Sequence, residues 1–148
     1  RGYPRAHTAG GPHRAGRAAW EPVTVALPGR TNVPGLQVTT KILERGGVSE
    51  ASLKSLDKEA YFDLQQIEPP ITLRTPSPGD RMQMFGMSGT KKLSDIFIDK
   101  KIPASRRHDT PVLTDSEHII WVVGVASSEI TRVDDGTREV IKISIEKT

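Results

Sequence analysis

The stretch PGDRMQMFGMSGTKKLSDIFIDKKIPASRR, residues 78–107, holds the clearest turn and helix signals in the chain. Its first three residues, Pro-Gly-Asp at 78–80, predict a turn, because proline fixes φ and glycine accepts the positive φ that other residues avoid. Leu93, Ile96 and Phe97 then recur at the spacing that places three apolar side chains on one helical face. The stretch therefore predicts a short helical segment reached through glycine turns, with the rest of the chain as its scaffold.

Capping residues mark the two ends of this helix. Ser88 or Thr90 can accept a hydrogen bond from the N–H groups of the first turn, so we expect the helix to begin near Thr90. Pro103 pushes the residue before it out of the α region and therefore ends the helix. Pro103 is also well placed as the first residue of a second short helix that carries Arg106 and Arg107.

The start of the helix has the chemistry of an anion site. A glycine-rich turn that runs into a helix exposes unpaired N–H groups and the positive end of the helix dipole, and Lys91 and Lys92 add two full charges there. The alternative is that segment 88–90 only caps a surface helix whose lysines point to water. Segment 86–91 departs from the GxxxxGK[ST] pattern of nucleotide-binding loops, so direct ATP binding is not expected here.

The distribution of charge indicates a polyanion as the partner. The net charge is +3, and residues 1–20 carry four arginines and no acid. Residues 71–110 carry eight basic side chains against four aspartates, so the remainder of the chain is net acidic. A basic region on an acidic body suits a nucleic acid docked on one side. The eight basic residues, which are the candidate RNA contacts, are Arg74, Arg81, Lys91, Lys92, Lys100, Lys101, Arg106 and Arg107.

Length and composition predict one domain with a tail. The 148 residues suffice for one compact core, and residues 1–20, poor in branched apolar side chains, are expected to be a flexible tail or linker before a domain at 21–148.

The chain has no cysteine, which excludes disulfides and thiolate metal sites. The longest apolar run, 119–126, is too short to cross a bilayer, so we expect a soluble protein. The start at Arg1 suggests a piece of a longer polypeptide.

Period-two alternation predicts a mainly β (α+β) domain with a helical insertion. Segments 23–27 and 36–42 alternate around a turn-rich connection and are interpreted as a strand pair. Segment 118–125 is a nearly continuous apolar run, typical of a central strand buried on both faces. A short helix is expected at 49–58, opened by Ser49 and with Leu53 and Leu56 inward. Further strands are expected at 60–64, 71–75 and 110–113, and a turn at 134–136. A last strand is expected to place Ile141, Ile143 and Ile145 on its buried face.

No catalytic or metal site is expected in the chain. Asp95 and Asp99 lie one helical turn apart, but such a pair is more often a solvated face with lysine neighbours. His108 and His118 have no nucleophile at a recognisable spacing. Trp121 is expected in the interior. The methionines and Phe85 at 82–87 are interpreted as packing under the loop, with an adaptable surface patch as the alternative.

Several blocks of the chain resemble the C-terminal domain of bacterial and plastid tRNA(Ile)-lysidine synthase. Members of that family show PGDR, then G.KKL.DFFID.KIP...R, then IPV..D...I.WV.G, and the similar part here runs from 71 to 125. The blocks occur in the family's order, and the Lys-Lys-Leu-Ser-Asp run at 91–95 is the strongest of them. After WVVGV the family commonly continues with an arginine-containing stretch such as R-I-S-E-R-F, whereas residues 126–130 here are Ala-Ser-Ser-Glu-Ile. Part of the RNA contact surface is therefore expected to be weakened.

The resemblance implies an RNA-binding part of a ligase. The family joins lysine to the wobble cytidine of an isoleucine tRNA with ATP, through an N-terminal domain whose Ser-Gly-Gly-x-Asp-Ser loop is absent from this sequence. It implies a β-sandwich-like fold similar to a module of the phenylalanine-tRNA synthetase β chain, with tRNA(Ile) and the N-terminal catalytic domain as partners. Basic positions of the family pattern are occupied by Arg81, Lys91, Lys92, Arg106 and Arg107; Lys100, Lys101 and Arg74 are added on charge alone.

Further expectations concern the parent enzyme. ATP and Mg are its expected cofactors, with none bound by this piece, which is expected to be inactive alone. Its compartment is expected to be the cytoplasm, with the plastid as an alternative, and a homodimer of the parent is left open. The competing hypothesis is a protein-interaction or packing module without RNA contact, in which the 82–87 patch docks on a partner domain.

Overall fold

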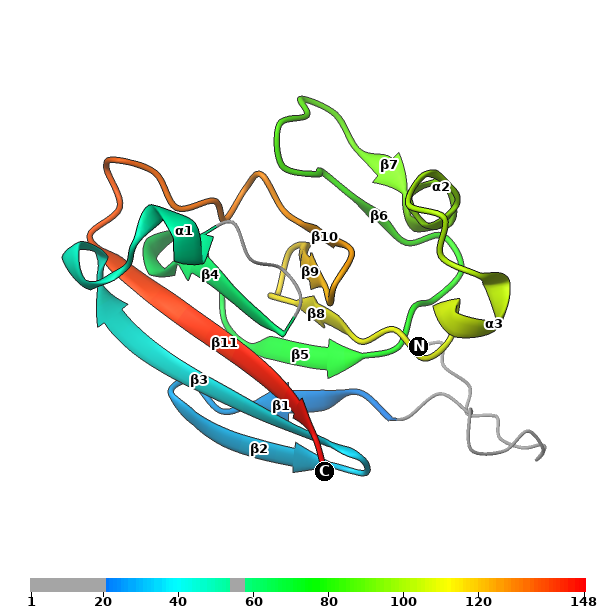
Figure 1. Cartoon of the computed structure of the whole chain (residues 1–148), viewed down its shortest axis with the longest axis horizontal. Coiled ribbons are helices and arrows are strands. Elements are labelled where there is room, and N and C mark those ends of the chain that lie inside the picture. The colour runs from blue at the N-terminus through cyan, green and yellow to red at the C-terminus, as the bar shows by residue number, and fades with distance from the viewer. Residues whose placement is uncertain (1–20, 54–57) are drawn as a thin grey trace.

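The computed structural model describes residues 21–53 and 58–148. The tail predicted at 1–20 and the inward position predicted for Leu56 lie outside the described residues. The remainder forms two antiparallel sheets that face each other, with a further layer on one side (Figure 1). The expectation of a mainly β domain with a helical insertion is confirmed.

The five-stranded sheet forms the middle of the molecule. Its strands, in spatial order, are β1 (Val23–Val25), β5 (Ile71–Arg74), β8 (Val112–Thr114), β9 (Ile119–Val122) and β10 (Ala126–Ser127). The four-stranded sheet packs on one face of it and contains β2 (Gly29–Val33), β3 (Leu36–Glu44), β11 (Glu139–Lys147) and β4 (Glu59–Asp63).

The layer on the other face of the five-stranded sheet is the insertion predicted from 78–107. We call it the hairpin–helix layer, and it consists of β6 (Arg81–Met82), β7 (Lys91–Lys92), α2 (Leu93–Asp99) and α3 (Ala104–Arg107). Figure 1 shows it on the side of the middle sheet away from β3 and β11. Three single-turn elements complete the chain: η1 (Arg45–Gly47), α1 (Glu50–Leu53) and η2 (Leu64–Gln66).

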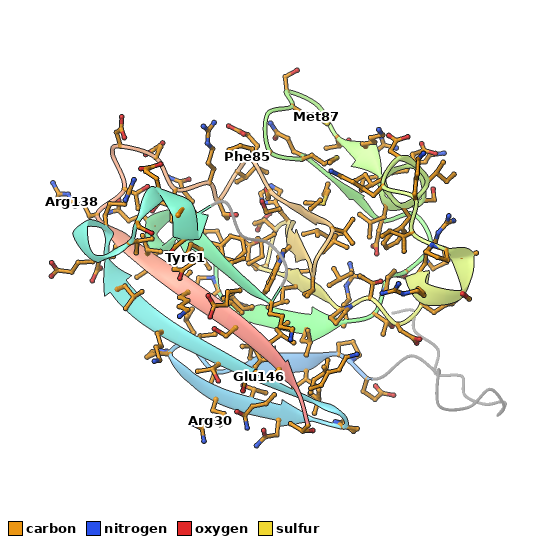
Figure 2. The ribbon with its side chains drawn as sticks, in the orientation of Figure 1. Arg30, Tyr61, Phe85, Met87, Arg138 and Glu146 are labelled. Carbon is orange, nitrogen blue, oxygen red and sulfur yellow. The ribbon has the colours of Figure 1, made fainter. Side chains whose placement is uncertain are left out.

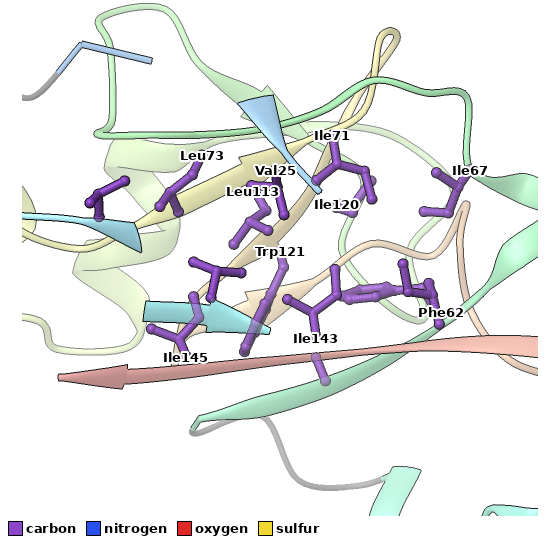
Figure 3. Close-up of a cluster of buried hydrophobic side chains, with 14 residues drawn as sticks. Val25, Phe62, Ile67, Ile71, Leu73, Leu113, Ile120, Trp121, Ile143 and Ile145 are labelled. Carbon is purple, nitrogen blue, oxygen red and sulfur yellow. The ribbon is translucent and has the colours of Figure 1, made fainter. Parts of the chain in front are cut away.

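The larger core lies between the two sheets. Ile141, Ile143 and Ile145 alternate along β11 and all face inward, as the period-two pattern predicted. Trp121 is fully buried, as expected, and its ring centre lies 6.1 Å from that of Phe62 (Figure 3). These aromatic and branched side chains supply most of the apolar burial that holds the sheets together.

A second, smaller core lies beneath the hairpin–helix layer. Leu93, Ile96 and Phe97, the three residues of the predicted helical face, are buried there together with Met82. All four residues of β9 are buried, because Ile120 and Trp121 face the larger core while the strand's two end residues face the smaller one. The prediction of a central strand with two buried faces is therefore confirmed for β9.

The predicted pairing of the first two strands is wrong. Segment 28–35, read as a turn-rich connection, contains strand β2, which pairs with β3 from Gly29↔Thr40 to Val33↔Leu36. Strand β1 instead pairs with β5 in the other sheet. Thr40 holds this crossing between sheets, because its hydroxyl donates to the Ala26 carbonyl at 2.7 Å and accepts from the Gly29 N–H at 3.0 Å. The prolines, glycines and asparagine of segment 28–35 therefore led to the prediction of a turn where strand β2 lies.

The eight-residue strand predicted at 118–125 is also too long. Strand β9 ends at Val122, because the Val125 N–H donates to the Val122 carbonyl at 2.8 Å and Gly124 adopts a φ of +76°. This tight turn leads back into β10, which pairs with β9. A glycine inside an apolar run marks a turn here, because glycine adopts positive φ at little cost. The turn at 134–136 is present as predicted. Ser49 opens a helix as predicted, but Leu53 is only half-buried and Lys58, the predicted last residue, is not helical.

Candidate nucleic-acid interface

The hairpin formed by β6 and β7 sets two basic side chains directly opposite each other. Arg81 is the Cα partner of Lys92, and Met82 is the partner of Lys91. Met82 is buried against the smaller core, whereas Arg81 and Lys92 are exposed. Directly paired residues share one face of a sheet, so burial of Met82 turns Arg81 and Lys92 together toward solvent.

Thr90 holds the Arg81 guanidinium in place. Arg81 Nε donates to Thr90 Oγ1 at 3.0 Å, and one terminal nitrogen donates to the Thr90 carbonyl at 3.2 Å. A guanidinium has five N–H donors, so three remain for another acceptor. The side chain is therefore oriented by the hairpin itself and keeps donors for an anion.

Asp80 anchors the hairpin to the middle sheet. Its carboxylate accepts two parallel hydrogen bonds from the Arg74 guanidinium at 2.9 and 3.0 Å and a third from the Ser77 N–H at 2.8 Å. Its carbonyl accepts the N–H of Leu93, the first residue of α2, at 2.9 Å. The turn predicted at 78–80 is thus present, and it joins β5, β6 and α2 in one network.

The helix begins later than predicted, and its cap differs. Helix α2 starts at Leu93 with Lys92 at the N-cap, and no side chain caps it. Neither Ser88 nor Thr90 performs the predicted capping role, because residues 91–92 pair with 81–82 as a strand and keep the chain extended. The Leu93 N–H is already bonded to Asp80, so the lysines sit on a hairpin rather than on an open helix start.

The end of α2 presents Lys100 and Lys101 to solvent. The Ile102 N–H donates to the Phe97 carbonyl at 2.9 Å and the Lys101 N–H to the Ile98 carbonyl at 3.0 Å, which is the Schellman pattern. Lys101 takes the left-handed position of that motif with a φ of 59°, where glycine is the usual residue. A side chain in this conformation costs roughly 1 kcal/mol relative to glycine.

The second helix carries the last two predicted cations. Helix α3 starts one residue after Pro103, which is its N-cap, so the predicted second helix is confirmed to within one residue. Arg106 is exposed. Arg107 is half-buried, with Nε donating to the Ile102 carbonyl at 2.9 Å and its guanidinium carbon 6.0 Å from the centre of the Phe97 ring.

Two of the eight candidate RNA contacts are held in ion pairs. Arg74 and Asp80 form a pair whose side chains are only 16% and 11% exposed. Lys91 pairs with Asp99, a lysine contact of the kind expected for this face of α2. Within 21–53 and 58–148, no ion pair to a carboxylate is made by the other six: Arg81, Lys92, Lys100, Lys101, Arg106 and Arg107.

The charges separate between the outer layers of the molecule. The hairpin–helix layer, residues 81–107, has seven basic residues and two aspartates. The strands of the four-stranded sheet have four basic residues and five acidic ones. Seven of the eight cations of the basic region seen in the sequence therefore lie in one layer of the fold, and the eighth, Arg74, lies in β5 of the middle sheet. This layer is on the opposite side of the middle sheet from the near-neutral layer (Figure 1).

An arginine that the sequence patterns did not single out contacts this layer. The Arg132 guanidinium lies 4.2 Å from the centre of the Phe85 ring, in the loop between β6 and β7. Phe85 was expected to pack under the loop, but it is 53% exposed. Met82, by contrast, belongs to the core, and Met84 packs against it. No local pattern signals the Phe85–Arg132 contact, because the two residues lie far apart in the sequence.

Asp115, a buried carboxylate that the sequence analysis did not single out, has a structural role. Asp115 is buried and accepts N–H bonds from Glu68, Glu117 and His118, which closes the turn between β8 and β9. Among the residues the structure describes, no cluster of three or more histidine and acidic side chains could hold a metal ion. In the same residues, no helix has the length and apolar character needed to span a membrane.

Comparison with known proteins identifies the family. The TilS substrate C-terminal domain family matches residues 71–145, about half of the chain and twenty residues further than the blocks of the resemblance. The chain belongs to this family. Its TilS domain contains both the hairpin–helix layer and strand β11, so the match covers parts of both cores.

Relatives of the TilS domain are tRNA(Ile)-lysidine synthases. The protein of Symbiobacterium thermophilum is 36% identical over 146 residues, which cover 98% of this chain and 30% of the relative. The protein of Clostridium acetobutylicum is 40% identical over 87 residues, or 59% of this chain and 19% of the relative. The chain thus spans less than a third of the length of these relatives.

Solved structures agree with the TilS fold. A structure described as the crystal structure of the TilS C-terminal domain matches with a TM-score of 0.72 and 26% identity, covering 88% of this chain and 98% of that one. An N-terminal fragment of the phenylalanyl-tRNA synthetase β-subunit from Pyrococcus horikoshii matches with a TM-score of 0.57 and 20% identity, over 73% of this chain and 38% of that one. The second likeness concerns the fold alone.

Proposed function

We propose that this chain is the tRNA-binding domain of a tRNA(Ile)-lysidine synthase, an ATP-dependent ligase whose catalytic domain lies elsewhere in the polypeptide. Its relatives bear that enzyme's name, and the chain corresponds to less than a third of their length. The domain holds the sugar-phosphate backbone of tRNA(Ile) and makes no covalent bond itself. The proposed contacts are the six cations that have no carboxylate partner among the described residues: Arg81, Lys92, Lys100, Lys101, Arg106 and Arg107.

The pairing of Arg81 with Lys92 carries this proposal. Directly opposite residues of an antiparallel pair have Cβ atoms about 5 Å apart, and like charges in that relation destabilise the pair. Neither side chain has a carboxylate partner in the described residues that would offset the repulsion. A phosphate that contacts both would do so, because each can donate charge-assisted hydrogen bonds to it. The hairpin is therefore suited to binding the phosphate of a partner molecule.

Lys101 supports the same role. Its left-handed backbone conformation would be adopted more easily by glycine, so the lysine costs stability where it stands. With Lys100 it places two exposed cations at the end of α2, next to the short helix that bears Arg106 and Arg107. These contacts fix the position of an RNA but carry no sequence information themselves, since phosphates are the same at every nucleotide.

Arg74 and Lys91 enter the proposal differently from the other six. Their charged groups are engaged with Asp80 and Asp99, so an RNA contact by either would compete with an existing ion pair. We assign Arg74 chiefly to anchoring the hairpin, because its guanidinium fork is bonded to both oxygens of Asp80. Lys91 is the more exposed of the two and can exchange partners more easily.

The salt dependence of RNA binding tests the proposal. In the double variant Arg81→Gln and Lys92→Gln, the slope of log affinity against log salt for a tRNA(Ile) transcript should become shallower by roughly 0.9 per lost phosphate contact. The matched control is Arg30→Gln with Lys41→Gln on the four-stranded sheet, which removes the same charge from the opposite side of the molecule (Figure 2 labels Arg30). Filter binding over a series of salt concentrations measures both.

Two outcomes of the salt experiment would contradict the proposal. Equal slopes for the double variant and the wild-type chain would mean that the hairpin cations do not contact phosphate. An equal loss in the control would mean that only total charge matters. The chain alone, incubated with tRNA(Ile), ATP and lysine, is expected to yield no lysidine by nucleoside mass spectrometry. Any lysidine would contradict the proposal that catalysis belongs to another domain of the polypeptide.

A further inference from the structure

The loop between β6 and β7 presents an aromatic ring to solvent. Phe85 is 53% exposed, although a phenylalanine side chain normally gains free energy by burial. Figure 2 shows Phe85 and Met87 in this loop, on the side of the molecule away from Arg30. The Arg132 guanidinium covers one ring face at 4.2 Å from its centre, so the exposed area lies on the opposite face and the ring edge.

Hydrogen bonds hold the loop that bears this ring. The Phe85 N–H donates to the Ser127 carbonyl at 3.0 Å, and the Glu129 N–H donates to the Gln83 carbonyl at 2.9 Å. Glu129 Oε1 accepts the Gly86 N–H at 2.8 Å while its other oxygen lies 3.6 Å from Arg132. The negative charge of Glu129 is therefore engaged on both oxygens. The ring is held in place before any partner arrives.

We propose that Phe85, backed by Arg132, is a stacking platform for an unpaired nucleobase of the bound RNA. Aromatic rings and arginine planes stack on bases that are free of a helix. The Arg132 side chain is itself 46% exposed, so it can also contact the phosphate of the stacked nucleotide. The proposal deepens the proposed function, on which it rests, by naming the part of the RNA that this loop takes.

Charge favours a nucleotide over a protein as the occupant. Phe85 follows Arg81 by four residues, at most about 14 Å along the chain, so one hairpin carries both the ring and the like-charged pair. Residues 81–92 contain three cations and no acid. An aromatic face beside Arg81 and Lys92, which have no carboxylate partner in the part of the chain that the structure describes, suits a partner with flat bases and phosphates. A single RNA strand supplies both in every nucleotide.

The test compares RNA with and without unpaired bases. The probes are a blunt RNA duplex and the same duplex with a single-stranded 3′ overhang, bound to the full chain. Phe85→Leu keeps an apolar side chain but removes the aromatic face, so affinity for the overhang probe should fall about tenfold while the salt slope stays unchanged. Affinity for the blunt probe should stay within about twofold. Phe85→Trp should retain binding, and its added fluorescence should be quenched by the overhang probe.

Controls separate this inference from the proposed function. Ile42→Ala removes another exposed apolar side chain, 40% exposed on the four-stranded sheet, and should leave both affinities unchanged. If Phe85→Leu has no effect, or lowers the affinity for both probes equally, the stacking proposal is wrong. The proposed function still holds in that case, provided that the double variant of Arg81 and Lys92 changes the salt slope. If Phe85→Leu spares both probes but disrupts association with the catalytic domain, the loop is a protein contact and the platform is wrong.

Discussion

The two layers that cover the five-stranded sheet differ in both core and surface. The four-stranded sheet closes a core of fourteen buried residues that includes Phe62 and Trp121, and its strands are close to neutral. The hairpin–helix layer closes a core of nine and carries seven cations against two aspartates. Self-repulsion among like charges opposes compact folding. The scaffold is thus concentrated in one layer, and the charge that opposes folding, which we propose binds RNA, is concentrated in the other.

This difference explains why the hairpin–helix layer needs specific anchors. Strands β6 and β7 contribute only two residues each, so their ladder hydrogen bonds are few. The Arg74–Asp80 pair and the bonds from the loop to β10 supply the attachment that a long strand pair would give. The contribution of each polar contact to the attachment of this layer can be measured by removing the contacts one at a time.

The largest effect is expected in the larger core. Phe62→Ala should lower the free energy of unfolding by about 3–5 kcal/mol, because it leaves a cavity beside Trp121. Urea denaturation measures the loss. Amide exchange along β11 should accelerate together with exchange in α2, since loss of the scaffold unfolds both layers.

Ile96→Ala in the smaller core completes this comparison. This substitution should lower the free energy of local unfolding of the hairpin–helix layer by about 2–5 kcal/mol. Faster amide exchange should be confined to that layer, while the amides of β11 stay protected. If Ile96→Ala exposes β11 as strongly as Phe62→Ala does, the two layers form a single cooperative unit and the distinction between scaffold and attached layer fails.

A somewhat smaller effect is expected at the anchor between the layers. Asp80→Asn removes the carboxylate charge that the Arg74 guanidinium contacts in a partly buried site, so the free energy of unfolding should fall by about 3 kcal/mol. Glu50→Gln is the matched control, because it breaks the Arg45–Glu50 pair, whose glutamate is 78% exposed, and should cost less than about 1 kcal/mol. Equal melting curves for the two variants would show that Asp80 is no anchor.

The smallest effect is expected at the end of α2, where stability and binding should move in opposite directions. Lys101→Gly removes the side chain from a left-handed position and should raise the free energy of unfolding by roughly 0.5–1 kcal/mol. The same change removes a proposed phosphate contact, so the salt slope for the tRNA(Ile) transcript should become shallower by about 0.9. A stabilised variant with an unchanged slope would leave the lysine without a role in RNA binding.

Local pattern predicted the elements well but not their partners. The alternation of isoleucines on β11, the apolar face of α2 and the short helix after Pro103 follow from sequence spacing and are present. The pairing of β1 with β5 was missed, because two neighbouring alternating segments pair by default and nothing local shows that the chain changes sheets between them. The start of α2 was placed too early for the same reason, since pairing with β6 overrides helical spacing at 91–92.

The candidate site divides in the same way. Its residue types and their concentration in 71–110 can be read from the sequence, since charge is a property of composition. Which cations remain available could not be read, because the Arg74–Asp80 and Lys91–Asp99 pairs depend on side chains brought together by folding. The contact between Phe85 and Arg132 joins segments that no motif connects.

The sequence alone determined that the chain is mainly β, that it has a basic helical insertion, and that it resembles a tRNA-modifying ligase domain, because these follow from periodicity, charge and motif order. The tertiary structure alone decided that Arg81 faces Lys92 and that Arg132 backs an exposed Phe85. Register and long-range packing are collective outcomes of burying two cores at once. No short stretch of the chain contains the information that fixes them.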